Sequence, residues 1–582
     1  MTPSESAFAS RDDLKAYGDN ARLLFALQMR CDIDDIDSVA SFAIVDGADD
    51  KGCDLVYVDR GRGLLVVAQG YESQRQREAA PANKADSLST AAAWLFAREY
   101  DDLPERLKNV AYEVRAAIGA GEIDSVEFWY VHNVGESENV RNSMKTVETS
   151  VRSTITDRFG RDKLPERIVA TEVGPKTQDE WYEALAVHIL VNETINLPLK
   201  GHFDLEGENW TAVVTAVPAT WLQQQYRKYQ ERLFSANYRE YLGVKNKSRR
   251  NEINEGIQST ASDQPGYFWV YNNGVSAIVN DFKVTKAENG TSILEIKGLS
   301  IVNGAQTTGA LGSLTKILGE QALVPIRFIR CNDVETIAEI VRYNNSQNPL
   351  VPADFKSNDS VQRRLREEFQ KIPQCRYVGG RRGVERIRAQ DNLIASDTCG
   401  QALAAFHGRP DIAYHQKADI WRDDAVYQNF FCVHTTSAHI VLAYSLLKAI
   451  EERKKLLREK GEQRTQQETQ QFDFLSERGA IHLMTAGIAG CMEELLGRRI
   501  SSLFKLSFGP KCGPAEAVKQ WAPIVAALMP LSSQLSLGTR SGVKDRESNK
   551  QAINAFCQHV ASIKAASGAT VFDTFAKRVV EA

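Results

Sequence analysis

Side-chain amides are concentrated in three short segments of this 582-residue chain. An amide both donates and accepts hydrogen bonds, so such segments suit a polar ligand. Each segment follows an apolar run, and we expect the three to surround one pocket. Its expected ligand-binding residues are Asn272, Asn273, Asn303, Gln306, Asn345 and Gln347.

The second of these segments has the pattern of a strand end, a turn and a helix start. Ile301 and Val302 are typical of a strand, Asn303-Gly304 of a turn, and residues 305–318 of a helix. Backbone N–H groups at a helix N-terminus favour an anion such as a phosphate. The first segment, Asn272-Asn273-Gly274, has the composition of a tight hairpin turn between strands at 267–271 and 275–279. A turn alone would explain it, although two asparagines exceed what a turn needs.

Asp54 and Gln69 form a second candidate site. Three runs predict strands at 39–45, 54–58 and 64–68, and residues 59–63 have a turn composition. If residues 60–63 form the loop, Asp59 pairs with Leu64 and Asp54 lies opposite Gln69. A carboxylate and an amide would then lie side by side on one face.

The elements around this pair occur in the order α-β-β-β-α-β. Helices are predicted at residues 12–31 and 85–100, and a further strand at 126–132. The order resembles the core of the PD-(D/E)xK nuclease superfamily, although other small α/β domains share it. In such nucleases an Asp and a Glu or Gln hold Mg²⁺, and a Lys two residues later steadies the attacking water.

This resemblance implies Mg²⁺ ligands at Asp54 and Gln69, but Tyr71 stands at the lysine's position. A phenol cannot supply the positive charge, so the site is either inactive or served by another lysine. The expected catalytic set is Asp54, Gln69 and Lys84, with Lys51 as a second candidate for the lysine. The plain alternative is that Asp54 caps a strand and that Gln69 and Tyr71 are the polar end of a buried one.

Arginines follow the third amide segment and suit a nucleic acid backbone. Arginines with interleaved aromatic and glycine residues could stack on bases and follow a nucleic acid strand. The expected nucleic-acid contacts are Arg363, Arg376, Arg381 and Arg382, with Arg364, Arg366, Arg386 and Arg388 in the same two patches. A solvated charged face is the alternative, because Glu367, Glu368 and Glu385 dilute both patches.

The overall composition is that of an ordinary globular protein. Lys plus Arg (71) and Asp plus Glu (75) nearly cancel, so nucleic acid binding would depend on local patches. The sequence shows no leader pattern and no run long enough to span a bilayer, and we expect a cytoplasmic protein without membrane contact. Nine scattered cysteines without a CxxC pair predict reduced thiols, and Cys432, His434 and His439 lack a fourth metal ligand.

Five motifs between residues 233 and 349 resemble those of the AIPR family, the abortive infection phage resistance proteins. They are Leu233 to Gly243, Ile253 to Ile257, Phe268 to Val275, Ile301 to Thr308 and Tyr343 to Pro349. Weaker similarity covers roughly residues 35 to 435. The resemblance implies bacterial antiviral defence and, in many members, a nuclease-like N-terminal domain with Gln-x-Lys. The segment at 301–308 is also remotely similar to ParB-like nucleotide-handling domains, but Asn303 and Thr307 replace their Asp and Arg.

We therefore expect an α/β multidomain protein with three domains and a connecting segment. They are a restriction-endonuclease-like α/β domain at 1–175, a connecting segment at 176–230, an α/β AIPR core at 231–431 and a helical C-terminal domain at 432–582. The last contains a charged stretch at 451–471, which we expect to be an exposed helix or a linker. The expected function is Mg²⁺-dependent nucleic acid cleavage in antiphage defence, controlled by the AIPR core. Alternatives are an inactive recognition subunit working with a partner defence protein, and a ParB-like nucleotide hydrolase. A homo-oligomer is possible in each case.

Overall fold

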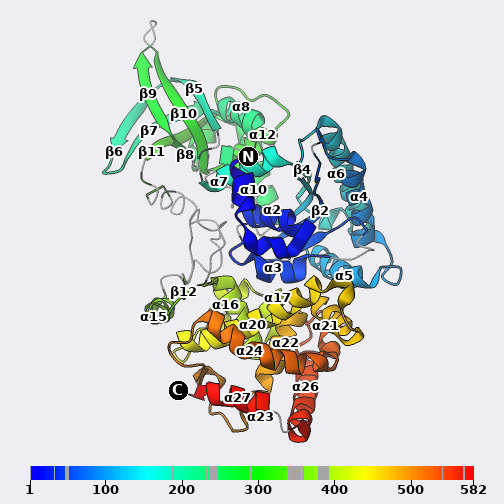
Figure 1. The fold of residues 1–582 in the computed structure, drawn as a ribbon. Helices are drawn as coiled ribbons and strands as arrows, with labels where there is room; N and C mark the ends of the chain where they lie inside the picture. Colours follow the sequence, from blue (N-terminus) through cyan, green and yellow to red (C-terminus); the bar gives the residue numbers. More distant parts are fainter. Residues whose placement is uncertain are drawn as a thin grey trace. The chain divides into compact units, whose positions relative to one another are not determined.

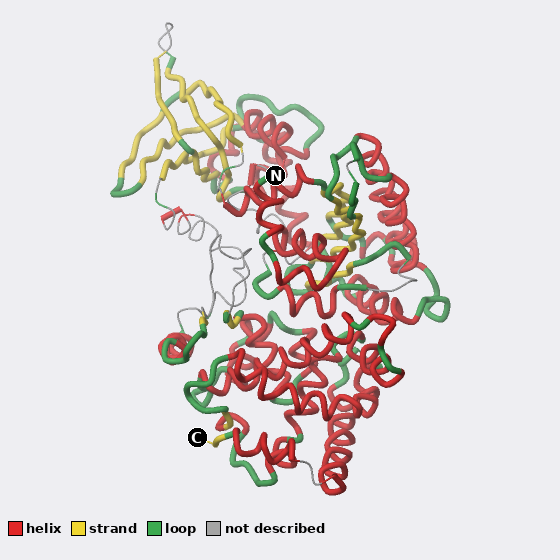
Figure 2. The backbone as a smooth tube through the Cα atoms, in the orientation of Figure 1, coloured by secondary structure: helices red, strands yellow, loops and turns green. Residues whose placement is uncertain are grey.

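The computed structural model of the chain contains two compact units (Figures 1 and 2). One comprises residues 1–4 and 176–350, and the other residues 5–175 and 351–582. The structure describes residues 2–31, 33–45, 51–75, 77–186, 189, 191–230, 233–234, 247–286, 291–331, 333, 336–337, 340, 356, 359–377, 392–540, 542–567 and 570–581. The chain combines α/β parts with a helical C-terminal region, which confirms the predicted fold class.

The N-terminal part of the second unit is built on a four-stranded sheet with the order β1-β2-β3-β4. Its strands are β1 (Leu55–Asp59), β2 (Leu64–Tyr71), β3 (Ser125–His132) and β4 (Arg167–Val173). β1 and β2 form an antiparallel hairpin, while β2, β3 and β4 are parallel. The hairpin register pairs Asp59 with Leu64, as the sequence predicts.

Helices cover both faces of this sheet. Alternate apolar residues such as Val67 and Phe128 share one core with α4, α5 and α6, while α2 contacts β2 and β3. The helical elements are α1 (Pro3–Ala9), η1 (Asp12–Asn20), α2 (Ala21–Cys31), α3 (Ile36–Ala43), α4 (Ala82–Ala92), η2 (Ala93–Ala97), α5 (Glu105–Gly119), α6 (Glu138–Phe159) and η3 (Arg161–Lys163). The predicted helix at 12–31 is thus a 3₁₀ segment followed by α2.

The predicted strand at 39–45 is wrong, because most of this segment is helix α3. Asp35 precedes the helix, and its carboxylate accepts a hydrogen bond from the backbone N–H of Ser38 at 3.1 Å. Such an N-cap satisfies a backbone donor that would otherwise lack a partner. Only the end of the segment pairs with β1, through a single bridge between Ile44 and Leu55.

The other unit is built on a seven-stranded sheet. Its order is β5-β10-β8-β11-β7-β6, with β9 paired to β10. The strands are β5 (Val191–Leu199), β6 (His202–Glu206), β7 (Trp210–Pro218), β8 (Val275–Val279), β9 (Asp281–Lys286), β10 (Ser292–Asn303) and β11 (Leu323–Cys331). The helical elements are α7 (Pro175–Ala186), α8 (Ala219–Tyr229), α10 (Lys247–Asp263), η5 (Pro265–Tyr267), α11 (Phe268–Tyr271) and α12 (Ala305–Ser313). Residues of α8, α10, α11 and α12 share a core with the sheet.

The predicted hairpin around Asn272-Asn273-Gly274 is also wrong. The residues before it form helix α11 instead of a strand, and β8 pairs with β10 and β11. Phe268 is buried, but Tyr267, Trp269, Val270 and Tyr271 are exposed. One buried residue followed by three exposed ones does not fit the alternation of a half-buried strand.

The C-terminal region is an assembly of helices around one core. α20 packs against α24, and the indole of Trp521 donates to the Leu442 carbonyl at 3.0 Å. The helices are α15 (Ser360–Phe369), α16 (Ser396–Phe406), α17 (Pro410–His415), α18 (Asp419–Arg422), α19 (Asp424–Phe430), α20 (Ser437–Glu459), α21 (Gln466–Ser476), α22 (Ala480–Gly490), α23 (Met492–Leu496), α24 (Pro514–Leu528), α25 (Ser536–Thr539), α26 (Arg546–Ser567) and α27 (Thr570–Arg578). Short pairs join β12 (Arg376–Tyr377) to β13 (Leu393–Ile394) and β14 (Leu506–Ser507) to β15 (Val580–Glu581). Within the described ranges, no helix combines the length and apolar character that a membrane span requires.

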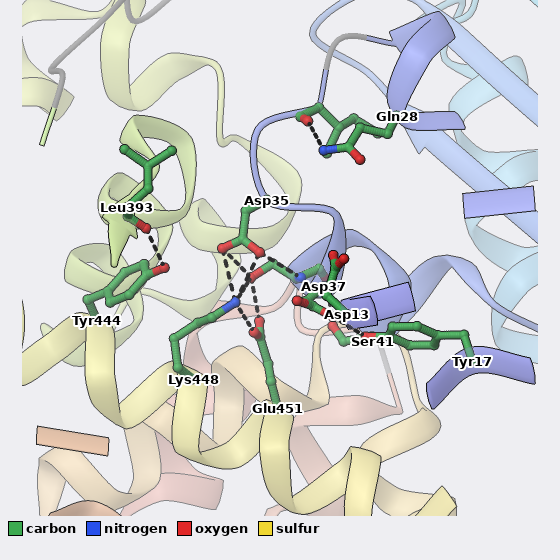
Figure 3. A network of polar contacts seen from close by, with 12 residues as sticks. Asp13, Tyr17, Gln28, Asp35, Asp37, Ser41, Leu393, Tyr444, Lys448 and Glu451 are labelled. Carbon is green, nitrogen blue, oxygen red and sulfur yellow. Dashed lines mark hydrogen bonds and ion pairs between the residues drawn. The ribbon is translucent and has the colours of Figure 1, made fainter. Parts of the chain in front are cut away.

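The charged segment 451–471, expected to be an exposed helix or a linker, contains the end of α20 and most of α21. The ammonium group of Lys448 lies 3.0 Å from both Asp35 carboxylate oxygens and 2.8 Å from Glu451 (Figure 3). Lys454 is buried and donates to the Ser41 and Leu475 carbonyls. The sequence suggests that these lysines are solvent-exposed, because their partners Asp35 and Ser41 lie at or within α3, some four hundred positions earlier.

Replacing Lys448 by Met should destabilise the N-terminal and helical parts together. The substitution leaves Asp35 and Glu451, which are 11% and 9% exposed, without their cation. Breaking a fully buried ion pair from one side costs about 3–5 kcal/mol, and we expect the lower end of this range for this partly buried group. Urea unfolding of the full chain measures the loss. Lys15→Met is the matched control, since Lys15 and its partner Asp12 are 70% and 83% exposed, and it should change stability by less than about 1 kcal/mol. Equal effects of the two substitutions would contradict this account.

Candidate functional site

The structure brings Asp54 and Gln69 together at the end of the hairpin. The Gln69 amide nitrogen donates to Asp54 Oδ2 at 2.7 Å, and the Gly70 backbone N–H donates to the same oxygen at 2.7 Å. Asp54 itself is fixed through its backbone, because its N–H donates to Ala68 and its carbonyl accepts from Val45. The side-by-side placement expected from the register is therefore present.

The side-chain oxygen of Gln69, Oε1, is a buried acceptor without a hydrogen-bond donor in the part of the chain that the structure describes. Gln69 is 6% exposed. A buried acceptor left without a donor is costly, and a hard cation is one way to satisfy it. Asp54 and Gln69 thus fit part of an Mg²⁺ coordination sphere. Nowhere in the described ranges do three or more His, Cys, Asp or Glu side chains group as metal ligands, so substrate phosphates and water would complete the sphere.

Neither candidate lysine occupies the position of Tyr71. Lys84 is exposed on the first turn of α4. One turn later, Ser87 faces Gly52, where a Cβ would lie 2.9 Å from the Ser87 Cβ. Lys84 is therefore one helical turn from the segment that leads into Asp54. The Lys51 ammonium lies over the Trp94 ring, 4.9 Å from its centroid.

Polar residues also lie on β3 and β4 beside Gln69 and Tyr71, and the sequence did not predict them. The register places Tyr130 beside Gln69, and His132 beside Tyr71. His132 is fully buried, with Nδ1 3.0 Å from the Val134 carbonyl and Nε2 3.3 Å from Glu172. Burial, with Tyr71 nearby, raises the pKa of the Tyr130 phenol. The available signal was the alternation of polar residues at strand ends, since residues two apart share a face.

Two of the three amide segments meet in the other unit. The Asn272 amide donates to Thr307 Oγ1 at 3.2 Å, and its oxygen accepts from the Gly274 N–H at 2.9 Å. Gln306 donates to Asn254 on α10 at 3.2 Å, while Asn273 is exposed. Asn303 pairs with Ser276, whose hydroxyl accepts from Arg327 at 2.6 Å. Asn345 and Gln347 lie outside the described residues, so the third segment remains a prediction.

Gly304 makes the turn into α12 possible. Its φ is +90°, and a Cβ there would lie 2.8 Å from Val275 Cγ2 and 2.9 Å from the Gly274 carbonyl. We expect Gly304→Ala to lower the free energy of unfolding by about 1–3 kcal/mol, because strain and crowding add. Gly309→Ala in the same helix is the control, since no atom lies within 4 Å of its Cβ position, and it should stabilise by about 0.4–1 kcal/mol. Thermal unfolding distinguishes the two, and a loss at Gly309 matching that at Gly304 would contradict the explanation.

The arginines expected to contact nucleic acid divide into three groups. Arg363 and Arg376 are exposed, whereas Arg381 and Arg382 lie outside the described residues. Arg364 has a structural role, because it donates to the Cys432 and Thr435 carbonyls and pairs with Glu368.

The comparisons with known proteins give one match. A family model described as AIPR protein matches residues 234–563, which is more than half of the chain. None of the curated proteins and none of the solved structures matches it. The match covers most of the seven-stranded sheet and most of the helical region, and it begins after the four-stranded sheet that carries Asp54.

Proposed function

Because the chain belongs to the AIPR protein family, we propose that it acts in abortive-infection defence against phage and that its N-terminal domain cuts nucleic acid with a divalent cation. The family supports the defence role. The cutting activity is supported by one observation above all: the Asp54 carboxylate and the Gln69 amide lie in contact, and the buried Gln69 Oε1 has no hydrogen-bond partner among the residues that the structure describes.

The residues of the site have distinct roles in this proposal. Asp54 provides the negatively charged oxygens that hold the cation, and Gln69 Oε1 provides a neutral one. When bound, a divalent cation would polarise the scissile phosphate and activate a water molecule. The Gly70 N–H orients the Asp54 carboxylate, since it donates to Oδ2. Lys84, exposed and one turn from the residue that faces Gly52, is the candidate cation for the attacking water.

The experiment uses the purified full chain with single- and double-stranded DNA and RNA, in Mg²⁺ or Mn²⁺ and in a chelator. Cation-dependent cleavage of at least one polymer is expected. Tyr71→Lys places an ammonium group two residues after Gln69, and we expect it to raise the cleavage rate by about tenfold or more. Tyr100→Lys, at an exposed tyrosine of the same domain, should leave the rate unchanged. Cleavage by neither the natural chain nor Tyr71→Lys would refute the proposal.

A second candidate, recognition of nucleic acid without cutting, is favoured by a different observation. Tyr267 and Tyr271 stack with ring centroids 5.6 Å apart, and they are 58% and 64% exposed beside Asn272. Exposed aromatic rings are the usual platforms for unpaired bases. If this candidate holds, Tyr271→Ala and Trp269→Ala each weaken binding of a single-stranded oligonucleotide, and the chain shows no turnover.

A further inference from the structure

The hairpin that carries Asp54 and Gln69 is held by basic residues from the helical region. Arg478 Nη2 donates to the carbonyl of Val56 at 3.0 Å, and Val56 lies in β1, two residues after Asp54. Lys417 Nζ lies 3.3 Å from Asp59 at the end of β1. Arg422 donates to the Gly61 carbonyl in the turn at 3.3 Å. All three basic residues fall within the part of the chain that the family model matches.

Arg478 is fixed by more than its contact with β1. It is 3% exposed and lies between α21 and α22, with its Nε 3.5 Å from Glu113 on α5. The Tyr414 hydroxyl donates to the same Glu113 oxygen at 3.0 Å. A buried guanidinium must stay close to its counter-charge. The Val56 carbonyl, on the edge strand of the sheet, is therefore held against a rigid charged group.

The far end of β1 is held equally firmly. Asp59 is 4% exposed and accepts from the Tyr57 hydroxyl, the Arg62 N–H and Lys417. In the turn, a Cβ on Gly61 would lie 3.0 Å from the Ala418 Cβ, so the turn lies close against the helical region. Charge pairing and steric contact thus fix the same hairpin end.

The segment before Asp54 is fixed in the same way. Lys448 and Lys454 bind α3 through Asp35 and the Ser41 carbonyl (Figure 3 shows the Lys448 network). α3 leads into Val45, whose N–H donates to the Asp54 carbonyl at 2.8 Å. The chain on both sides of Asp54 is therefore anchored on the helical region.

We propose that Arg478 and Lys417 are positioning residues for the Asp54–Gln69 pair. Through them, the family-matched helical region holds the hairpin that carries the cation site, without contacting the site itself. This inference rests on the proposed cutting function. It explains how a site near the N-terminus can depend on a region more than three hundred positions later. Groups that hydrogen-bond to metal ligands contribute strongly to metal affinity. Arg478 and Lys417 act one step further away, through Val56 and Asp59 of β1.

The test measures two properties of the full chain in Arg478→Met and Lys417→Met. The first is hydrogen exchange in residues 54–71, where the Gly70 N–H reports on Asp54 directly. The second is Mn²⁺ affinity by electron paramagnetic resonance, with Asp54→Asn defining specific binding. We expect faster exchange and about tenfold weaker Mn²⁺ binding in both variants. Arg478→Lys should restore most of the affinity, which a purely structural role would not predict.

Controls separate the possible outcomes. Arg364→Met is matched to Arg478→Met, because Arg364 also donates to backbone carbonyls but within the helical region, and it should leave both properties unchanged. If Arg478→Met does not fold, Gly61→Ala disturbs a different contact of the same hairpin more mildly, that of the turn with Ala418. If the natural chain shows Asp54-dependent Mn²⁺ binding and Arg478→Met and Lys417→Met leave it unchanged, the positioning role is overturned but the proposed function is not. No Asp54-dependent binding in the natural chain overturns the proposed function, and the positioning role with it.

Discussion

Asp54→Asn should reduce cation-dependent cleavage by about a hundredfold or more, the scale seen when a group that stabilises transition-state charge is removed. The substitution replaces the only carboxylate of the Asp54–Gln69 pair by a second amide, and two neutral oxygens bind a divalent cation weakly. The fold should survive, since the Asn oxygen can still accept from the Gly70 N–H that now lies 2.7 Å from Asp54 Oδ2.

Initial rates with saturating oligonucleotide and a range of Mn²⁺ concentrations measure this effect. Asp86→Asn is the matched control, because Asp86 is an exposed carboxylate on α4 in the same domain. Equal rates for the natural chain and Asp54→Asn would show that the cutting site lies elsewhere. If a high Mn²⁺ concentration restores the cleavage rate of Asp54→Asn, the defect lies in cation binding. If it does not, the defect lies in the chemical step.

The hairpin around this site could be predicted from the sequence because its information is local. The turn composition of residues 59–63 sets the register, and the register alone places Asp54 opposite Gln69. The observed pairing of Asp59 with Leu64 and the hydrogen bond between Gln69 and Asp54 follow from this count. The position of Lys84 does not follow from this count, since it depends on the packing of α4, where Ser87 faces Gly52.

Two wrong strand predictions can be explained from the local sequence. The segment 39–45 contains enough β-branched and aromatic residues to suggest a strand, but Asp35 three residues before Ser38 is an N-cap signal that favours a helix. The aromatic run at 267–271 likewise suggested a strand. Its single buried residue, Phe268, shows that burial pattern and not residue type decides such short segments.

The interface between the N-terminal domain and the helical region could not be predicted. Lys417, Lys448 and Arg478 each look like solvated charges in their local sequence, because charged residues are rarely buried unless paired. Their partners Asp59, Asp35 and Glu113 lie in the N-terminal part of the same compact unit, far earlier in the sequence. Without the fold, no pattern in a single sequence connects them.

Buried histidines in the helical region should make the chain sensitive to acid. His439 Nδ1 lies 3.0 Å from the Leu506 carbonyl and must donate to it, so its Nε2 is an acceptor. The Nε2 of His407, 3.0 Å away, must then donate. At least the His439 ring is therefore neutral, since its Nε2 carries no proton. Burial lowers the pKa of His439 and His415 to about 4, and burial lowers that of His407 and His482 to about 3.

The sign of the effect follows from these directions. Above pH 6.5, the ordinary pKa of histidine, the folded and unfolded chains are both neutral at these positions, and the histidines have no effect. As the pH falls below 6.5, the unfolded chain gains protons that the folded chain cannot take, and stability is lost until the pH reaches the folded values. For the well-buried His439 and His482 the loss at pH 4 is about 2–3 kcal/mol each. Glu451 acts in the opposite direction, because burial raises its pKa to about 6.

Urea unfolding of the full chain between pH 7 and pH 4 tests this prediction, with hydrogen exchange in α22 reporting on the helical region. His482→Gln removes one titrating ring and should flatten the profile, retaining about 2 kcal/mol more stability than the natural chain on going from pH 7 to pH 4.5. His559→Gln, at an exposed histidine on α26, should leave the profile unchanged. Identical profiles for the natural chain and His482→Gln would show that acid acts through other groups, of which the paired carboxylates Asp35 and Asp59, whose pKa values are lowered, come first.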